Sequence, residues 1–391
     1  MFLSQPLIEV LAARGIEDID AFVAPPTWSD LPSPFSIPEM GEAAERIFRA
    51  VNDSEKIAIF GDYDCDGVLA THILRRTLRL LGPDARAYLP HRDEGYGLSA
   101  PAVHDFSKSG TNLLITVDNG INARSTAQLA ERLGIDVIVV DHHRIQERAK
   151  ALAVWSPEYC GAGLATLLSS ALLTQAKWQQ SKREEVLSSL CAYAAIASIA
   201  DCVPLMGPTR TITRLGLREL AGVKGHGAKR LIQSACTDPQ RPDSHDVSFG
   251  IAPRINAAGR LAHPTLALNV LEAESDAEAA SGVERLNELN EERRRIVRIH
   301  FAELVQSLGA SSAAALVVFG AAWPRGIAGL LASKCTERFS APAIVVVPST
   351  ERGLVVGSSV SLERDRMRVL CDSIQSRQRI AVAVKESFPQ V

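Results

Sequence analysis

Short apolar runs alternate with amphipathic stretches between residues 45 and 155. The apolar runs cover residues 57–60, 85–89, 113–117, 136–140 and 151–155. Between them, residues 68–81 and 123–133 have the apolar periodicity of helices that bury one face. Strand–helix alternation at this spacing is typical of a parallel sheet with helices on both faces. We therefore predict an α/β fold whose ligands bind past the carboxyl ends of the strands.

The rest of the chain divides into further segments. Residues 162–220 have a mostly helical pattern, and residues 221–265 are expected to be rich in loops. A long amphipathic stretch carries the charge run 291–295, so we expect a solvated helix that connects two domains. The predicted divisions are an N-terminal lead-in (1–44), a parallel-sheet domain (45–275), the connecting helix (276–308) and a smaller α/β domain (309–391).

The composition fits a globular protein of two or three domains. Hydrophobic residues make up 46% of the 391 residues, which is too much for a chain that is disordered over most of its length. The 42 basic and 45 acidic residues give a net charge of −3, which argues against a protein that coats nucleic acid non-specifically. A local basic groove is compatible with this balance, because the local charge matters more than the net charge.

Neither targeting segments nor disulfides are expected. The N-terminal stretch lacks a basic segment and carries Glu9 among its apolar residues, so we do not predict a signal peptide. The sequence has no run of about 18 apolar residues, and no membrane span is expected. The seven cysteines are scattered without a C-x-x-C pair, which favours a reducing cytoplasm over a disulfide framework or a thiolate zinc site.

Three carboxylates follow the first apolar run. Asp62, Asp64 and Asp66 alternate with other residues, and like charges this close repel unless cations neutralise them. Their oxygens suit hard divalent ions such as Mg²⁺ or Mn²⁺. A calcium-binding EF-hand loop is one alternative, but that loop needs Glu at its twelfth position, where this chain has Ile73. A solvated acidic turn is the other alternative.

Similar residues follow later apolar segments. Asp118 comes after the third run. Asp141, His142 and His143 come at the end of the fourth, and Asp201 follows an apolar helix. Each of these residues alone could cap a helix or lie in a turn. Together they are expected to converge on one edge of the sheet, with enough carboxylates and imidazoles for two divalent ions that clamp a phosphoryl transfer.

The strand-end residues resemble the four motifs of the DHH phosphoesterase superfamily. These motifs are Asp62-Tyr-Asp64-Cys-Asp66-Gly67, Val117-Asp118-Asn119-Gly120, Asp141-His142-His143 and Ala200-Asp201. Further stretches are similar to the RecJ branch of that superfamily, namely residues 31–35, 91–98, 253–260 and 286–293. The resemblance covers roughly residues 5–345.

This resemblance implies a two-metal phosphodiesterase, with Mn²⁺ preferred or Mg²⁺ as the cofactor. Such an enzyme would remove mononucleotides from the 5′ end of single-stranded DNA, with a role in DNA repair or recombination. The resemblance also implies a DHH domain that a long helix joins to a smaller α/β DHHA1-like domain. Single-stranded nucleic acid, DNA above all, is the implied partner, and no membrane is involved.

The motifs imply roles for individual residues of this sequence. The implied ligands of one ion are Asp62, Asp64 and Asp118, and those of the other are Asp66, Asp118, His142 and Asp201. His143 would contact the scissile phosphate, and Asp141 would orient the histidines from behind. The residues on which catalysis would depend most are Asp64, Asp118, His142 and His143.

Arginines within the RecJ-like stretches are expected to bind the substrate. Arg92, Arg254 and Arg260 are the predicted phosphate contacts, because a guanidinium matches phosphate bidentately. Surface salt bridges are the alternative for each of them. Asn256 would brace the neighbouring loop or contact phosphate, with a plain turn position as the alternative.

The C-terminal part departs from the family pattern. Trp323-Pro324-Arg325 stands where the family has a Trp-His pair ahead of a helix start. The family's Gly-Ser-x-Arg-Ser stretch appears as residues 357–361, with Val360 at the arginine position, where no phosphate contact is possible. The family's later Gly-Gly-His stretch and oligonucleotide-binding barrel have no counterpart here. We therefore expect weak binding of long strands by this chain, and a protein partner that supplies strand binding.

Two other functions stay open. A reduced grip on nucleic acid also fits a phosphodiesterase for short oligonucleotides or cyclic dinucleotides. A non-catalytic scaffold subunit in a DNA replication or repair complex would keep the fold for protein contacts alone. The six acidic residues at the strand ends count against the scaffold, because such a subunit has no need for them.

Overall fold

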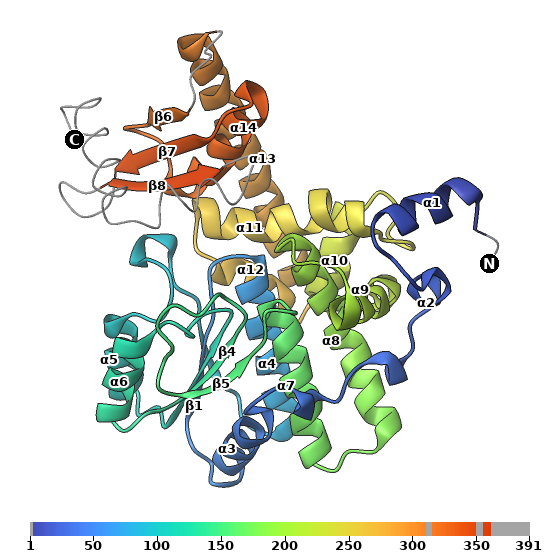
Figure 1. Ribbon diagram of the computed structural model, residues 1–391. Coiled ribbons are helices and arrows are strands. Elements are labelled where there is room, and N and C mark those ends of the chain that lie inside the picture. Colours follow the sequence, from blue (N-terminus) through green and yellow to red (C-terminus); the bar gives the residue numbers. More distant parts are fainter. Residues whose placement is uncertain (1–2, 310–314, 349–354, 361–391) are drawn as a thin grey trace.

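Figure 1 shows a computed structural model of the chain, which describes residues 3–309, 315–348 and 355–360. A larger unit is built around a five-stranded sheet, and a smaller unit around a three-stranded sheet. The long helix α13 (Asp276–Leu308) runs from one unit to the other. Ser361 of the predicted phosphate-binding stretch lies outside the described residues.

The larger sheet is parallel throughout. Its strands are β1 (Ile57–Phe60), β2 (Arg86–Tyr88), β3 (Leu113–Val117), β4 (Asp136–Asp141) and β5 (Leu152–Trp155). They lie in the order β2-β1-β3-β4-β5. Ile57 pairs with Leu113, which pairs in turn with Asp136, so the carboxyl ends of β1, β3 and β4 are adjacent. The predicted α/β fold with a parallel sheet is confirmed.

Helices cover both faces of this sheet. Ile57 and Ile59 of β1 belong to the core formed with α3 (Met40–Asn52), α4 (Cys65–Leu81) and α7 (Gly161–Gln175). Ala58 and Phe60 belong to a second core with α5 (Ala100–Lys108) and α6 (Arg124–Arg132) on the opposite face. Because successive side chains of a strand point to opposite faces, an unbroken apolar run is what a strand buried on both sides requires.

Helices make up the rest of the larger unit. They are α8 (Gln180–Ala200), α9 (Gly207–Glu219), α10 (His226–Ala235), α11 (Ala252–Leu261) and α12 (Thr265–Leu271). The expectation that residues 221–265 are rich in loops is wrong, because α10, the π-helical segment η5 (Asp246–Ile251) and α11 fill much of this range. Pro253 lies inside this helical stretch, just where η5 passes directly into α11, and a π-helical segment is one of the usual places where a helix accommodates a proline.

The N-terminal segment consists of short helices separated by prolines. They are α1 (Gln5–Ala13), α2 (Ile19–Val23), η1 (Trp28–Asp30) and η2 (Pro34–Ser36). Arg214 of α9 holds this segment by donating to the carbonyls of Phe22, Val23 and Ala24. No helix among the described residues is long and apolar enough to cross a membrane. The cysteines in the described part of the chain are free thiols.

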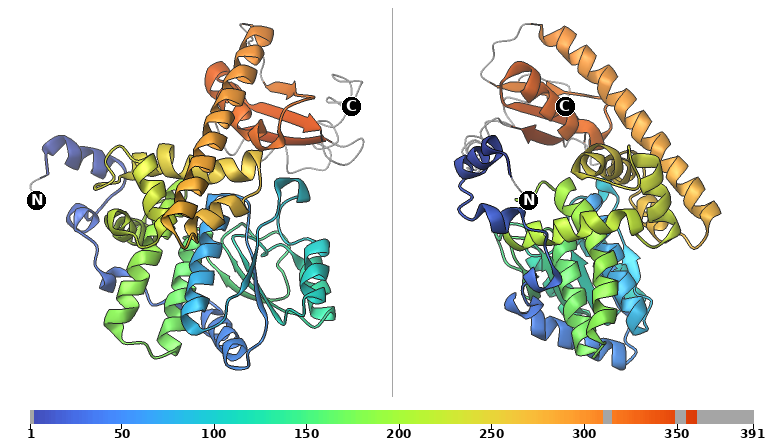
Figure 2. Two further views of the ribbon diagram at one scale, coloured as in Figure 1. Left: turned by 180° about the vertical axis from the view of Figure 1, so that it is seen from behind. Right: turned by 90° about the vertical axis from the view of Figure 1, so that its right-hand side faces the viewer.

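In the part of the smaller unit that the structure describes, a mixed sheet packs with the helix α14 (Ala328–Phe339). Strand β6 (Leu316–Phe319) pairs in parallel with β7 (Ala343–Pro348), and β7 pairs antiparallel with β8 (Val355–Val360). Its helix α14 (Ala328–Phe339) follows the 3-10 turn η6 (Arg325–Ile327). Val297 and Leu304 of α13 contribute to its core, so the long helix in Figure 2 is part of the packing of this unit as well as a connection.

Candidate active site

Polar side chains gather at the carboxyl ends of the three central strands. Asp62 follows β1, Asp118 follows β3, and Asp141 is the last residue of β4. Asp64 is the N-cap of α4, where its carboxylate accepts a hydrogen bond from the amide of Gly67 at 3.1 Å. Asp118 has a φ angle of +61°, a left-handed conformation that Asp adopts more readily than most residues. The sharp turn after β3 thus keeps Asp118 at the edge of the sheet.

The predicted metal ligands form two neighbouring groups. Ligand atoms of Asp62, Asp64 and Asp118 lie within 4.8 Å of one another. A second group with the same spread contains Asp66, His142 and Asp201. The Nε2 atom of His142 is 3.1 Å from Oδ1 of Asp118, which joins the two groups. Every residue of the two predicted ligand sets therefore lies at this edge of the sheet.

The amino end of α7 holds Asp66 in place. Its two carboxylate oxygens accept hydrogen bonds from the amides of Gly161 and Ala162, at 2.6 and 2.8 Å. Free amides at a helix N-terminus favour negative charge, so α7 offsets part of the cost of burying Asp66. A Cβ atom on Gly161 would lie 2.6 Å from Cβ of Asp118, so no larger residue fits there.

Asp141 organises the two histidines. Its Oδ1 atom accepts from the amides of His142 and His143, at 2.7 and 3.1 Å, and lies 2.7 Å from Nδ1 of His143. Its Oδ2 atom accepts from the amide of Ile121. Although burial opposes both charges, the bond between the two side chains lowers the pKa of Asp141 and raises the pKa of His143. The two side chains thus form an ion pair beside the ligand groups.

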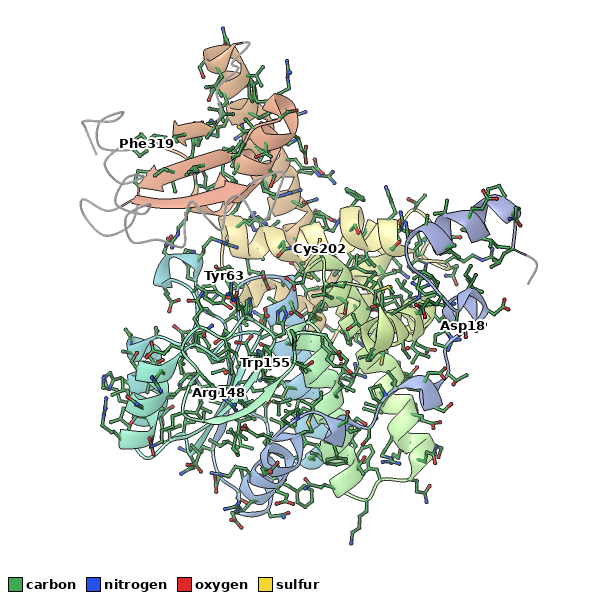
Figure 3. The ribbon with its side chains drawn as sticks, viewed as in Figure 1. Asp18, Tyr63, Arg148, Trp155, Cys202 and Phe319 are labelled. Atoms are coloured by element: carbon green, nitrogen blue, oxygen red, sulfur yellow. The ribbon has the colours of Figure 1, made fainter. Side chains whose placement is uncertain are left out.

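Two aromatic side chains also contact His143. The hydroxyl of Tyr96 is 3.1 Å from the ring nitrogens of His143. On the other side, Nε1 of Trp155 donates to the carbonyl of His143 at 2.8 Å; Figure 3 labels Trp155 in its place on the ribbon. These contacts and that of Asp141 fix His143 through its side chain and its backbone.

The charges at the site are poorly compensated by the protein itself. Burial and the Asp64 carboxylate raise the pKa of Asp62 to about 8. Burial and the carboxylates of Asp66 and Asp64 raise the pKa of Asp201 to about 7. The same two causes raise the pKa of Asp118 well above its ordinary value. Among the described residues, the buried Oδ1 atom of Asp62 has no hydrogen-bond partner. Hard divalent cations fit this set, because they would satisfy that oxygen and remove the mutual repulsion.

A cavity rich in arginine adjoins the acidic groups. It has a volume of about 350 Å³ and lies between the two units. Tyr63, which stands between two of the acidic residues, lines it together with Arg92 and Arg260. The smaller unit contributes Arg325 and Gly357. Figure 3 shows Tyr63 between the larger sheet and the smaller unit. Within the described part of the chain, no acidic side chain lines this cavity.

The arginines of the larger unit are held in fixed positions. The guanidinium of Arg92 lies 3.9 Å from the ring centre of Tyr63, and its Nε donates to the carbonyl of Gly259. Arg260 donates to the carbonyl of Gly326 at 2.7 Å. Burial and the nearby charges of Arg92 and Arg293 lower the pKa of Arg260 to about 10. An anion in this cavity would meet the guanidinium groups of Arg92 and Arg260, which have no carboxylate partner among the described residues.

Comparisons with known proteins agree with this geometry. The model of the DHH family, N-terminal domain, matches residues 56–199. The single-stranded-DNA-specific exonuclease RecJ of Bacillus subtilis (strain 168) is 37% identical over 349 residues, which cover 85% of this chain and 43% of the relative. The crystal structure of exonuclease RecJ bound to manganese matches with a TM-score of 0.75 and 30% identity, over 86% of this chain and 84% of that one. The chain belongs to the RecJ family.

Other RecJ proteins give the same picture. RecJ of Salmonella typhimurium is 33% identical over 351 residues, which cover 83% of this chain and 61% of the relative. The structure of RecJ in complex with Mn²⁺ from Thermus thermophilus matches with a TM-score of 0.76 and 28% identity, over 90% of this chain and 51% of that one. This chain thus spans about half the length of the curated RecJ relatives that it matches.

Two further predicted substrate contacts, Arg254 and Asn256, lie outside the lining of the cavity. The guanidinium of Arg254 donates to the side chain of Asn287 and to the carbonyls of Gly250 and Ser234. These bonds brace α11 against neighbouring helices, and a phosphate contact by Arg254 stays a prediction. Asn256 accepts a hydrogen bond from the amide of Cys65 at 3.0 Å. This hydrogen bond supports the predicted role of Asn256 as a residue that braces a loop, and the braced segment is the acidic turn after β1.

Sequence reasoning missed several residues of this RecJ-family site. Gly161 could have been found from the sequence, because the Cys-Gly-Ala-Gly stretch at residues 160–163 follows the last strand of the sheet. Tyr96 lies inside a stretch that resembles the RecJ branch, yet only the structure brings it to His143. Arg325 follows a departure from the family pattern and had no signal of its own, because its neighbours in the cavity come from distant parts of the sequence.

Proposed function

We propose that this chain is a metal-dependent exonuclease that hydrolyses single-stranded DNA from its 5′ end to mononucleotides. The observation that carries the proposal is the pair of ligand groups at one sheet edge, with an arginine-lined cavity beside them. Acidic groups suit divalent ions and arginines suit phosphates, so the two together fit a phosphodiester substrate. The RecJ relatives, which are named as single-stranded-DNA-specific exonucleases, support the choice of substrate.

Two divalent ions, Mn²⁺ or Mg²⁺, would complete the site. In this proposal Asp62, Asp64 and Asp118 hold one ion, and Asp66, Asp118, His142 and Asp201 hold the other. Ions at these places supply Lewis-acid stabilisation of the reacting phosphate and activation of water near neutral pH. The RecJ structures that contain manganese or magnesium support the choice of metals.

The protein's own residues position the scissile phosphate. His143 would contact it, because Asp141 orients its ring, its side chain is 40% exposed, and it belongs to the same group of side chains as Asp118 and His142. Tyr96, whose hydroxyl meets the same ring, would limit the movement of His143. Arg92 and Arg260 would bind a phosphate next to the scissile one. A bidentate guanidinium fixes both the position and the orientation of a phosphate, which is what in-line displacement requires.

The size of the cavity supports a substrate with a single strand. Its volume of about 350 Å³ lies at the low end of the range of roughly 300–1,000 Å³ for small-molecule sites. A space of this size suits one terminal nucleotide of a single strand. We expect single strands to be digested far faster than blunt duplexes, and we expect a partner protein to strengthen binding of long strands.

Purified protein with Mn²⁺ tests the proposal directly. The substrates are single strands of about 3 and about 40 nucleotides, labelled at either end, together with a 40-nucleotide duplex and an RNA strand. Release of mononucleotides from the 5′ end of the long DNA strand is the expected result. Cleavage of the 3-nucleotide strand alone would instead indicate an oligonucleotide phosphodiesterase. Absence of hydrolysis on every substrate would favour the scaffold role, and equal rates on duplex and single strand would contradict strand selectivity.

A further inference from the structure

The geometry points to Arg325 as a specificity residue that recognises the terminal phosphate of the strand. It enters the arginine-lined cavity from the smaller unit, opposite Arg92 and Arg260 of the larger unit. This assignment rests on the proposed exonuclease function and adds a residue that the family motifs do not predict. The ligand chemistry is a phosphate monoester, which carries more negative charge than a phosphodiester in the strand.

A close backbone contact fixes the position of Arg325. The next residue, Gly326, accepts a hydrogen bond from Arg260. A Cβ atom at Gly326 would lie 2.2 Å from the carbonyl oxygen of Arg260 and 2.6 Å from its Cα atom, so only glycine allows this approach. The turn η6 is therefore docked on α11, and Arg325 is held next to Arg260 across the boundary of the two units.

Arg325 is only weakly paired inside the protein. Its ionic contact with Asp93 has a length of 4.0 Å, the outer limit for an ion pair. The side chain of Arg325 is 27% exposed and that of Asp93 is 45% exposed, so water screens the pair and its contribution to stability is small. Three guanidinium groups thus share a cavity whose described lining has no carboxylate. A dianionic phosphate would relieve their repulsion and accept several of their hydrogen bonds.

The amino end of α14 adds to the preference for an anion. Ala328 and Gly329, in the first turn of this helix, also line the cavity. The N-cap position is Ile327, whose side chain cannot accept a hydrogen bond from the first amides. The amide of Ala328 itself donates to the carbonyl of Arg325, so it is the helix dipole that acts in the same direction as the arginines.

The register of β7 with β8 shows which residue of β8 lies at the cavity. Gly357 is the residue of β8 that lines the cavity. Val360, at the position of the family's arginine, pairs with Ala343 at the far end of β7. Gly357 and Val360 are three positions apart along the strand, which is about 10 Å. Among the described residues of the smaller unit, Arg325 on η6 is therefore the arginine that lines the cavity.

Fluorescence anisotropy with labelled 12-nucleotide DNA strands tests the assignment. The strands carry a 5′-phosphate, a 5′-hydroxyl or a 3′-phosphate, and Ca²⁺ replaces Mn²⁺ to suppress turnover. The wild type should prefer the 5′-phosphate. In Arg325→Ala this preference should fall about 10- to 100-fold, which is the worth of a charge-assisted hydrogen bond. The preference of Arg325→Lys for the 5′-phosphate should lie between those of the wild type and Arg325→Ala, because lysine keeps the charge but lacks the planar guanidinium group.

Arg338→Ala is the matched control, because it removes the same charge from an exposed site in the last turn of α14. It should leave the preference for the 5′-phosphate unchanged. Equal weakening of all three strands by Arg325→Ala, or no weakening, would overturn the assignment, and so would a selective loss for the 3′-phosphate. Hydrolysis with Mn²⁺ is measured on the same preparations. An inactive wild type would defeat the proposed function, while the binding preference would still report on Arg325.

Discussion

The metal-ligand groups and the arginine-lined cavity are adjacent, but they are assembled differently. Most of the ligands follow neighbouring strands of one sheet, so the topology of that sheet brings them together. The cavity takes Arg92, Arg260 and Arg325 from three separate segments and from both units. A group of ligands built on a single sheet is determined by the local sequence and by the order of the strands. A binding cavity formed by two units depends on how those units pack together. Its lining can therefore change while the metal-ligand groups stay the same.

Loss of a ligand shared by both groups should have the largest effect. Asp118→Ala is expected to abolish hydrolysis, because Asp118 contributes to one ligand group and contacts His142 of the other. The metal-free variant should also melt at a higher temperature than the metal-free wild type, since one of several repelling carboxylates is gone. Activity assays and thermal melts with and without Mn²⁺ measure both effects. Full activity in Asp118→Ala would refute the two-metal site, and Asp53→Ala, an exposed position, serves as the control.

A change at the amino end of α7 should weaken the metal centre without removing a ligand. In Gly161→Ala the new methyl group would meet Asp118, so α7 must shift and its hydrogen bonds to Asp66 must lengthen. We expect a loss of about 10- to 100-fold in apparent Mn²⁺ affinity, as for other contacts that orient metal ligands. Titration of activity with Mn²⁺ measures it.

The control for this change is Gly222→Ala, where an added Cβ atom would meet nothing within 4 Å. That variant should behave as the wild type does. If Gly161→Ala bound Mn²⁺ as tightly as Gly222→Ala, the helix would have no part in holding Asp66.

Removal of the Tyr96 hydroxyl should show whether Tyr96 positions His143 or binds the strand. Tyr96→Phe keeps the ring and loses the contact with His143. We expect kcat to fall severalfold, by about 1 kcal/mol of transition-state stabilisation, with KM unchanged. Steady-state kinetics on a short 5′-phosphorylated strand distinguish the two parameters. An increase in KM at constant kcat would mean that Tyr96 binds the strand instead of positioning His143.

An added arginine on β8 should have the smallest effect. The sequence pattern predicts that Val360→Arg tightens binding of 5′-phosphorylated strands selectively. The register of β7 with β8 changes this expectation, because Val360 pairs with Ala343, away from Gly357 and the cavity. We expect equal, slight tightening for strands with 5′-phosphate and 5′-hydroxyl, measured by anisotropy. A selective gain for the phosphorylated strand would restore the pattern-based expectation and would weaken the assignment of Arg325.

The sequence alone determined the sheet and the positions of the acidic residues at its carboxyl edge. Apolar runs of four or five residues fix the central strands through burial on both faces, and the residues that follow such a run lie at a carboxyl end. Asp62, Asp118 and Asp141 could therefore be located before any contact was known. The pairing of neighbouring strands then leaves little freedom in where these side chains lie.

Tertiary structure alone decided which arginines face the cavity. Arg254 and Arg260 lie on the same helix, six residues or about 240° apart around its axis, so only the packing of α11 tells which one points to the cavity. Arg325 joins Arg260 because two backbones approach at a glycine, a contact between residues that are far apart in sequence. The local sequence pattern predicts which face of a helix or strand is buried. It does not predict which distant element packs against that face.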